Sequence, residues 1–220
     1  LFCAAFVGVL AVATTPARAA DPLVSWNEGP AKARIVAFVE ATTGQGGKDY
    51  VAPSDRIAVF DNDGTLWSEQ PMYFQLAFAI DRVKALAPGH PEWKTREPFK
   101  AALEGDMKAL AASGEHGLLE LVMATHAGNT SEEFARIVRD WAKTARHPTF
   151  RRPYTELTYA PMRELLDYLR ANGFKTYIVS GGGVEFLRAF AADLYGVPPE
   201  QVIGSGIKAQ YAVRAGRPVI

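Results

Sequence analysis

Apolar runs that end in turn residues predict the strands of this chain. The run 57–60, branched and aromatic and bounded by turn residues, is typical of a strand buried on both faces of a parallel sheet. The run 174–179 predicts a second buried strand, and 201–203 a short third one. Farther on, 207–213 and the residues from 218 predict the arms of a hairpin. We therefore expect an α/β protein with a parallel sheet.

Helical periodicity and helix-end signals occupy most of the remaining chain. The predicted helices cover about 31–42, 73–87, 131–141, 161–171 and 184–194. Thr130 and Glu133 have the spacing of a capping box, and Pro161 stands where a first-turn proline is favoured. The segment 73–158 holds several helical signals and no alternating strand, which indicates a helical second domain inserted after the first strand.

The first 19 residues resemble a secretory signal peptide. Their apolar run is short for a membrane span, and Ala17-Arg18-Ala19 fits the small-x-small rule for cleavage after Ala19. A retained membrane anchor is the alternative. The chain opens with Leu1 and lacks a basic front end, so we expect its true start to lie upstream. We predict a secreted or periplasmic protein in which residues 20–54 form a lead-in helix.

Composition narrows the possible partners. The 220 residues include 24 Lys plus Arg and 24 Asp plus Glu, and this zero net charge argues against a nucleic-acid or anionic-membrane surface as the main partner. The single cysteine, Cys3, lies in the predicted signal peptide. We therefore expect neither a disulfide nor a thiolate metal site in the mature protein.

Two carboxylates stand directly after the first strand, in Asp61-Asn-Asp63-Gly. They can be ordinary turn residues, because Asp, Asn and Gly dominate turns. Two like charges at the tip of a buried strand are nevertheless unfavourable unless a cation or a shared proton compensates. The carboxyl edge of a parallel sheet is also where such folds bind ligands, which favours a chemical role for the pair.

A glycine-rich turn, Ser180-Gly181-Gly182-Gly183, follows the second strand and precedes a helix. Glycines permit close approach of the backbone, and the first amides of a helix favour an anion. The Ser180 hydroxyl can donate to the same anion. Such a turn also occurs as a plain tight connection, so its value lies in the match with the Asp pair.

These motifs together resemble the haloacid dehalogenase superfamily, and within it the phosphatases similar to phosphoserine phosphatase. The first family motif resembles the stretch Val59-Phe-Asp-Asn-Asp-Gly-Thr-Leu66. The second family motif resembles Ile178-Val-Ser-Gly-Gly182, through its serine and first glycine. The resemblance implies a Rossmann-like parallel-sheet core formed by 55–72 and 159–220, with 73–158 as a helical cap inserted after the first strand. In the dehalogenase branch the position of Asp63 is not acidic, so phosphate-ester hydrolysis is favoured here.

The resemblance also implies residue roles. Asp61 is similar to the nucleophile that forms an aspartyl-phosphate, and Asp63 to the general acid and base. Mg²⁺ would be held by the Asp61 carboxylate and the Asp63 backbone carbonyl. Ser180 and the Gly181 amide would hold the phosphoryl oxygens. The implied function is Mg²⁺-dependent hydrolysis of a small phosphate ester. The alternatives are a phosphotransferase and a non-catalytic ligand-binding protein of the same fold.

Several expectations stay open at this point. The family's lysine and later metal-binding acids have no clear match, and we expect them beyond residue 220; Lys208 lies in a predicted hairpin arm. Glu69 is either a substrate-selecting residue or a plain loop acid. The Gly204-Ser-Gly206 stretch lacks the helix and the acid that a dinucleotide site needs.

Overall fold

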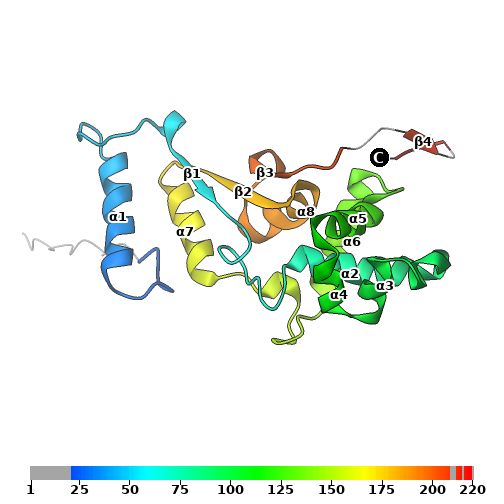
Figure 1. The fold of residues 1–220 in the computed structure, drawn as a ribbon. Helices are drawn as coiled ribbons and strands as arrows, with labels where there is room; N and C mark the ends of the chain where they lie inside the picture. Colours follow the sequence, from blue (N-terminus) through cyan, green and yellow to red (C-terminus); the bar gives the residue numbers. More distant parts are fainter. Residues whose placement is uncertain (1–20, 209–211, 215, 220) are drawn as a thin grey trace, which may run out of the picture.

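A computed structural model describes residues 21–208, 212–214 and 216–219. The predicted signal peptide lies outside this part and remains a prediction. The molecule is elongated, with α1 (Pro30–Thr43) at one end, a small sheet in the middle and a group of helices at the other end (Figure 1).

The central sheet is parallel and three-stranded. It consists, in spatial order, of β1 (Ile57–Phe60), β2 (Lys175–Gly183) and β3 (Val202–Ser205). β1 and β2 pair in register from Ile57 with Lys175 to Phe60 with Ile178. The predicted α/β class and parallel sheet are confirmed, and all three strands lie where apolar runs predicted them.

A separate antiparallel pair follows the sheet, formed by β4 (Ala212–Arg214) and β5 (Arg217–Val219). The hairpin was thus predicted correctly, but its first arm is shorter than 207–213. Ile207 and Lys208 are not in a strand, and residues 209–211 are outside the described part.

The helices α7 (Ala160–Ala171) and α8 (Val184–Tyr195) connect the three strands and cover one face of the sheet. Consecutive parallel strands joined by right-handed connections place both helices on the same side. Leu166 of α7 and Leu187 of α8 accordingly join one buried cluster with Phe60, Ile178 and Val202 of the strands. This cluster is the main core of the protein.

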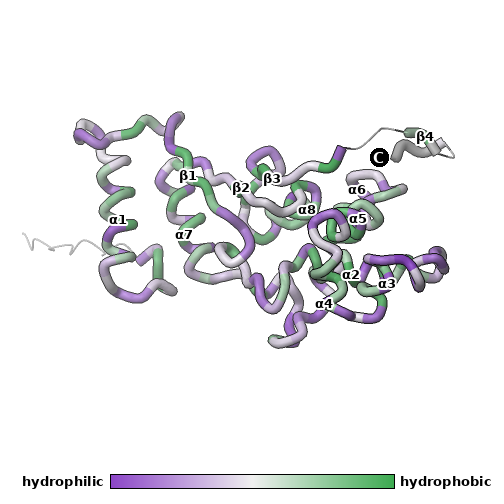
Figure 2. The backbone as a smooth tube through the Cα atoms, in the orientation of Figure 1, coloured by the Kyte–Doolittle hydropathy of each residue, from purple (hydrophilic) through white to green (hydrophobic). Residues whose placement is uncertain are grey.

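The opposite face of the sheet is apolar but exposed, which corrects the expectation that the first strand is buried on both faces. Ile57 and Val59 are 55% and 59% exposed, and Ile203 is 53% exposed. Figure 2 shows β1 as a hydrophobic stretch of the chain. The expectation was wrong for the described residues because both connecting helices lie on the other side of the sheet.

The segment between β1 and α7 is helical. Its helices are α2 (Phe74–Leu86), α3 (Phe99–Glu104), α4 (Met107–Ala112), α5 (Gly114–His126) and α6 (Ser131–Thr144). Two 3₁₀ turns, Ala87–Gly89 and Pro91–Lys94, lie between α2 and α3. Ile80, Val83 and Leu121 belong to a second buried cluster of this segment. Phe74 and Phe78 instead join the main core, so α2 is shared between the two clusters.

Local signals set several helix ends as the sequence predicted. In the capping box of α6, Thr130 Oγ1 accepts the Glu133 amide at 3.1 Å, and the Glu133 carboxylate accepts the Thr130 amide at 3.0 Å.

The N-terminal segment docks on α7, where Trp26 Nε1 donates to the Pro161 carbonyl at 2.8 Å. Three further 3₁₀ turns lie at Pro53–Asp55, Tyr154–Glu156 and Pro199–Gln201.

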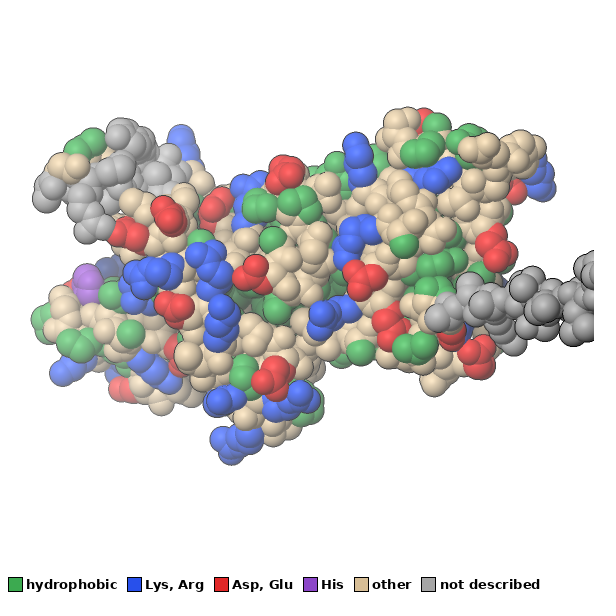
Figure 3. Space-filling model, turned by 180° about the vertical axis from the view of Figure 1, so that it is seen from behind, with side chains coloured by type: hydrophobic (Ala, Val, Ile, Leu, Met, Phe, Trp, Pro, Cys, Tyr) green, Lys and Arg blue, Asp and Glu red, His purple; other side chains and the backbone are tan. Residues whose placement is uncertain are grey.

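The surface carries both signs of charge. On the face shown in Figure 3, basic and acidic side chains are interspersed, in keeping with the zero net charge of the sequence. Throughout the described residues, no helix combines the length and the apolar content needed to cross a membrane.

Candidate active site

The loop after β1 is a tight turn organised around the backbone of Asn62. The Asn62 carbonyl accepts the amides of Leu66 at 2.8 Å and Thr65 at 3.2 Å, and the Trp67 carbonyl accepts the Gly64 amide at 2.9 Å. Gly64 has a φ of 72°, a left-handed conformation that glycine adopts without steric penalty. The turn therefore holds the residues on either side of Asn62 in fixed positions at the tip of the strand.

The two carboxylates of this loop have different surroundings. Asp61 is exposed, whereas Asp63 is half-buried and accepts a 2.7 Å hydrogen bond from the indole Nε1 of Trp67. Burial raises the pKa of Asp63, and the charges of Asp61 and Glu69 raise it further, while the Trp67 bond acts in the opposite direction. A carboxyl group with a raised pKa retains its proton more readily, as a general acid requires.

The carboxyl group of Glu69 packs against Gly64 of the turn. A Cβ atom added at Gly64 would stand 2.9 Å from the Glu69 carboxyl carbon, so the glycine makes room for this side chain. Glu69 is half-buried and contributes to the charge around Asp63. Glu69 thus lies at the candidate site. Its role in selecting a substrate stays a prediction.

The glycine-rich turn is part of β2, which runs to Gly183 and not only to Val179 as predicted. The pairing of β2 with β3 becomes irregular between these two residues, so the strand locally departs from the ladder while remaining extended. Ser180 Oγ accepts the Gly182 amide at 3.2 Å. As an acceptor in this bond, the hydroxyl keeps its own proton for donation.

Close packing of β3 supports the turn. A Cβ atom at Gly204 would lie 2.7 Å from the Gly182 carbonyl oxygen, so glycine is needed for the two backbones to approach. Ser205 Oγ donates to the Gly181 carbonyl at 2.8 Å. Around Gly181, in contrast, a Cβ would meet nothing within 4 Å, which leaves open space beside its backbone.

The four residues predicted for the site line one cavity of about 480 Å³. Asp61 and Asp63 come from the tip of β1, and Ser180 and Gly181 from the end of β2. The cavity is lined by Asp61, Asp63, Glu69, Tyr73, Gln75, Leu76, Leu118, Val122, Ser180, Gly181 and Gly182. Parallel strands end at the same edge of a sheet, which is why residues more than a hundred positions apart meet here.

Sequence reasoning missed part of this lining. Gln75 and Leu76 come from α2, and Leu118 and Val122 from α5, so the helical segment forms one wall of the cavity. The sequence predicted the helix of α2 but no helix at α5, and helical spacing does not tell which face of a helix meets the sheet. None of the described lining residues is Lys or Arg, and Lys208 is not among them.

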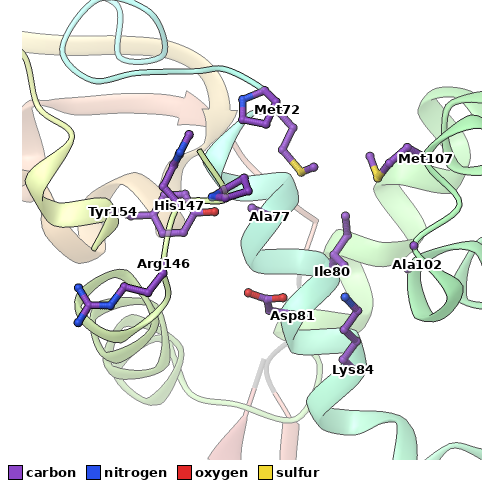
Figure 4. Close-up of a pocket in the computed structure, with 13 residues that line it drawn as sticks. Met72, Ala77, Ile80, Asp81, Lys84, Ala102, Met107, Arg146, His147 and Tyr154 are labelled. Carbon is purple, nitrogen blue, oxygen red and sulfur yellow. The ribbon is translucent and has the colours of Figure 1, made fainter. Parts of the chain in front are cut away.

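A second cavity, of about 250 Å³, lies against another side of α2 (Figure 4). Ala77, Ile80, Asp81 and Lys84 line it from α2, and Met107 lines it from α4. Asp81 accepts a 2.9 Å hydrogen bond from Trp141 Nε1. The site residues predicted from the sequence do not line this cavity. Asp81 is therefore a suitable control for substitutions of the carboxylates in the larger cavity.

The donor set of the larger cavity suits a hard cation only in part. Carboxylate and carbonyl oxygens are the ligands that Mg²⁺ prefers, and Asp61 and Asp63 supply them at one edge of the sheet. In the part of the chain described, however, no three His, Cys, Asp or Glu side chains are grouped to hold a metal. The two residues could thus contribute part of a coordination shell whose other positions are taken by water or substrate.

Comparison with protein families identifies the family of this fold. An α/β sheet of this kind binds ligands at the carboxyl edge of its strands, where the acids and the Ser-Gly turn line one cavity. The model of the haloacid dehalogenase-like hydrolases matches residues 58–217, more than half of the chain. The chain belongs to this family.

Two solved structures are similar to this chain at low identity. One is a phosphoserine phosphohydrolase-like protein from Francisella tularensis subsp. tularensis SCHU S4, with 18% identity, a TM-score of 0.37, and coverage of 73% of this chain and 61% of that one. The other is a conserved functionally unknown protein from Anaerococcus prevotii DSM 20548, with 16% identity, a TM-score of 0.41, and coverage of 86% and 70%. The chain thus spans 61% of the length of the Francisella protein. The curated proteins yielded no match.

Proposed function

We propose that the protein is an exported, Mg²⁺-dependent hydrolase of small phosphate esters that acts through an aspartyl-phosphate on Asp61. Membership of the hydrolase family supports the reaction class. The observation that carries the proposal is the convergence of Asp61, Asp63, Ser180 and Gly181 on one cavity. Export rests on the predicted signal peptide alone.

The proposed reaction has two steps. In the first, a carboxylate oxygen of Asp61 attacks the phosphorus, the bond to the ester oxygen breaks, and Asp63 donates its proton to the leaving alcohol. In the second, Asp63 takes a proton from a water molecule, whose oxygen attacks the phosphorus and releases inorganic phosphate and free Asp61. The raised pKa of Asp63 suits its role in the first step.

The remaining groups would bind and orient the phosphoryl group. The Ser180 hydroxyl and the Gly181 amide can donate to its oxygens from the end of β2. The start of α8, which Gly183 caps, adds a favourable helix dipole. Mg²⁺ held by the Asp61 carboxylate and the Asp63 carbonyl would offset the negative charge shared by the phosphate and the acids.

Replacement of the nucleophile tests the proposal. In the full-length protein, Asp61→Asn should reduce phosphate release from p-nitrophenyl phosphate with Mg²⁺ to background, because an amide does not form the acyl phosphate. Asp81→Asn, which changes a carboxylate of the second cavity, should leave the rate within about twofold. Retained activity in Asp61→Asn would contradict the nucleophile assignment.

The same preparation separates the alternatives. A phosphotransferase would pass the phosphoryl group to an added alcohol acceptor in preference to water, which product analysis detects. A non-catalytic member of the family would bind inorganic phosphate but release none from the ester.

A further inference from the structure

One side chain of the helical segment reaches the glycine-rich turn directly. Gln75, the second residue of α2, accepts the amide of Gly183 through Oε1 at 2.7 Å. Gly183 ends β2 and caps α8. A single hydrogen bond therefore joins residues 108 positions apart and links the helical wall of the cavity to the turn proposed to bind phosphate.

The space around Gly183 is fitted to this side chain. A Cβ atom at Gly183 would lie 2.5 Å from Gln75 Nε2, and one at Gly182 would lie 3.5 Å from Gln75 Oε1. The backbone of Gly183, with φ −65° and ψ 125°, is extended and open to any residue. A side chain at Gly183 would therefore have to displace the end of Gln75, whereas the backbone conformation excludes no residue.

The bond also occupies one of the backbone amides of the turn. The Gly183 amide is engaged by Gln75, and the Gly182 amide by Ser180 Oγ. Among the described residues, no side chain and no backbone group outside the sheet accepts the Gly181 amide, and open space lies beside it. Gln75 lines the same cavity as Ser180 and Gly181.

We infer that Gln75 is a positioning residue, which fixes the Ser180–Gly183 turn in its anion-receiving conformation and couples the helical segment to phosphate binding. This inference deepens the proposed function and rests on it for the ligand. The geometric argument is that a glycine-rich turn has several accessible conformations, and a bond from outside the sheet selects one of them. Loss of that bond should therefore weaken phosphate binding without removing any group that touches the substrate's ester.

Gln75→Leu in the full-length protein tests the inference, with inorganic phosphate as the probe in calorimetry. The expected result is an increase of the phosphate Kd by about fivefold to tenfold, the equivalent of one hydrogen bond. For p-nitrophenyl phosphate, KM should rise by a similar factor while kcat changes less than twofold. Lys84→Leu, on the side of α2 that lines the second cavity in Figure 4, is the control and should change neither value.

Gly183→Ala provides an independent disruption. Its new methyl group should displace Gln75 and raise the phosphate Kd as Gln75→Leu does. In a Gln75→Ala background the obstruction is gone, so adding Gly183→Ala should raise the Kd less than twofold. Amide exchange at Gly183, measured by NMR without ligand, should become faster in Gln75→Leu because the amide loses its acceptor.

Unchanged phosphate Kd in both Gln75→Leu and Gly183→Ala would overturn the inference, as would equal effects of Gly183→Ala with and without Gln75. These outcomes differ from failure of the proposed function. If Asp61→Asn keeps full turnover while Gln75→Leu still weakens phosphate binding, the nucleophile assignment is wrong and the positioning role holds.

Discussion

Trp67 joins the core to the candidate site, and Trp67→Phe tests this link. The side chain is fully buried and packs on Phe74 and Phe190 with ring centroids 4.6 and 4.5 Å away. Its Nε1 donates to Asp63 Oδ1 at 2.7 Å. Phenylalanine retains an aromatic ring at this position but removes the donor and three buried heavy atoms.

The expected loss of stability has two parts. Removing buried atoms from a close-packed core costs about 2–3 kcal/mol when the surroundings relax only partly. A hydrogen bond to a charged acceptor contributes about 1.5–3 kcal/mol, which we reduce to about 1 kcal/mol because Asp63 is only half-buried. The sum is about 3–4 kcal/mol. For a protein of this length it should lower Tm by about 10 °C.

Trp141→Phe is the matched control. Trp141 also donates to a carboxylate, Asp81 at 2.9 Å, but both residues are more exposed and lie away from the site. Because Trp141 is only partly buried, its replacement should lower the free energy of unfolding by about 1–2 kcal/mol, through lost packing on Tyr154 and the lost hydrogen bond. Urea unfolding of the full-length variants, followed by circular dichroism, measures both values. A Trp67→Phe protein as stable as Trp141→Phe would refute the reasoning.

Two further predictions concern the loop and the helical segment. Gly64→Ala should destabilise the fold more than Gly128→Ala, because both have left-handed φ angles but only the first places a methyl group against Glu69; urea unfolding gives the difference, and equal losses would exclude the contact. Burial lowers the pKa of His126, so the unfolded chain takes up the proton first and stability should fall as pH drops below about 6.5. His126→Asn should flatten this dependence in melts from pH 8 to 5, whereas exposed His116→Asn should not; an unchanged slope in His126→Asn would contradict the assignment.

The sequence alone determined the local elements and the polar residues at their ends. Apolar runs followed by turn residues located β1, β2 and β3, and the capping box located the start of α6. Both signals are read within a few residues of the chain, so they need no knowledge of distant contacts. The parallel arrangement also followed, because a helical segment separates each strand from the next. It brought Asp61 and Ser180 to one edge.

The tertiary structure decided which faces those elements bury and which partners they find. The exposure of Ile57 and Val59 depends on both connecting helices lying on one side of the sheet, which no local pattern reports. The bond from Trp67 to Asp63 and the bond from Gly183 to Gln75 depend on how the loop and α2 pack. The sequence could therefore predict the acids and the glycine-rich turn as parts of the candidate site. Only tertiary packing placed the Trp67 indole against Asp63 and the Gln75 side-chain amide against the turn.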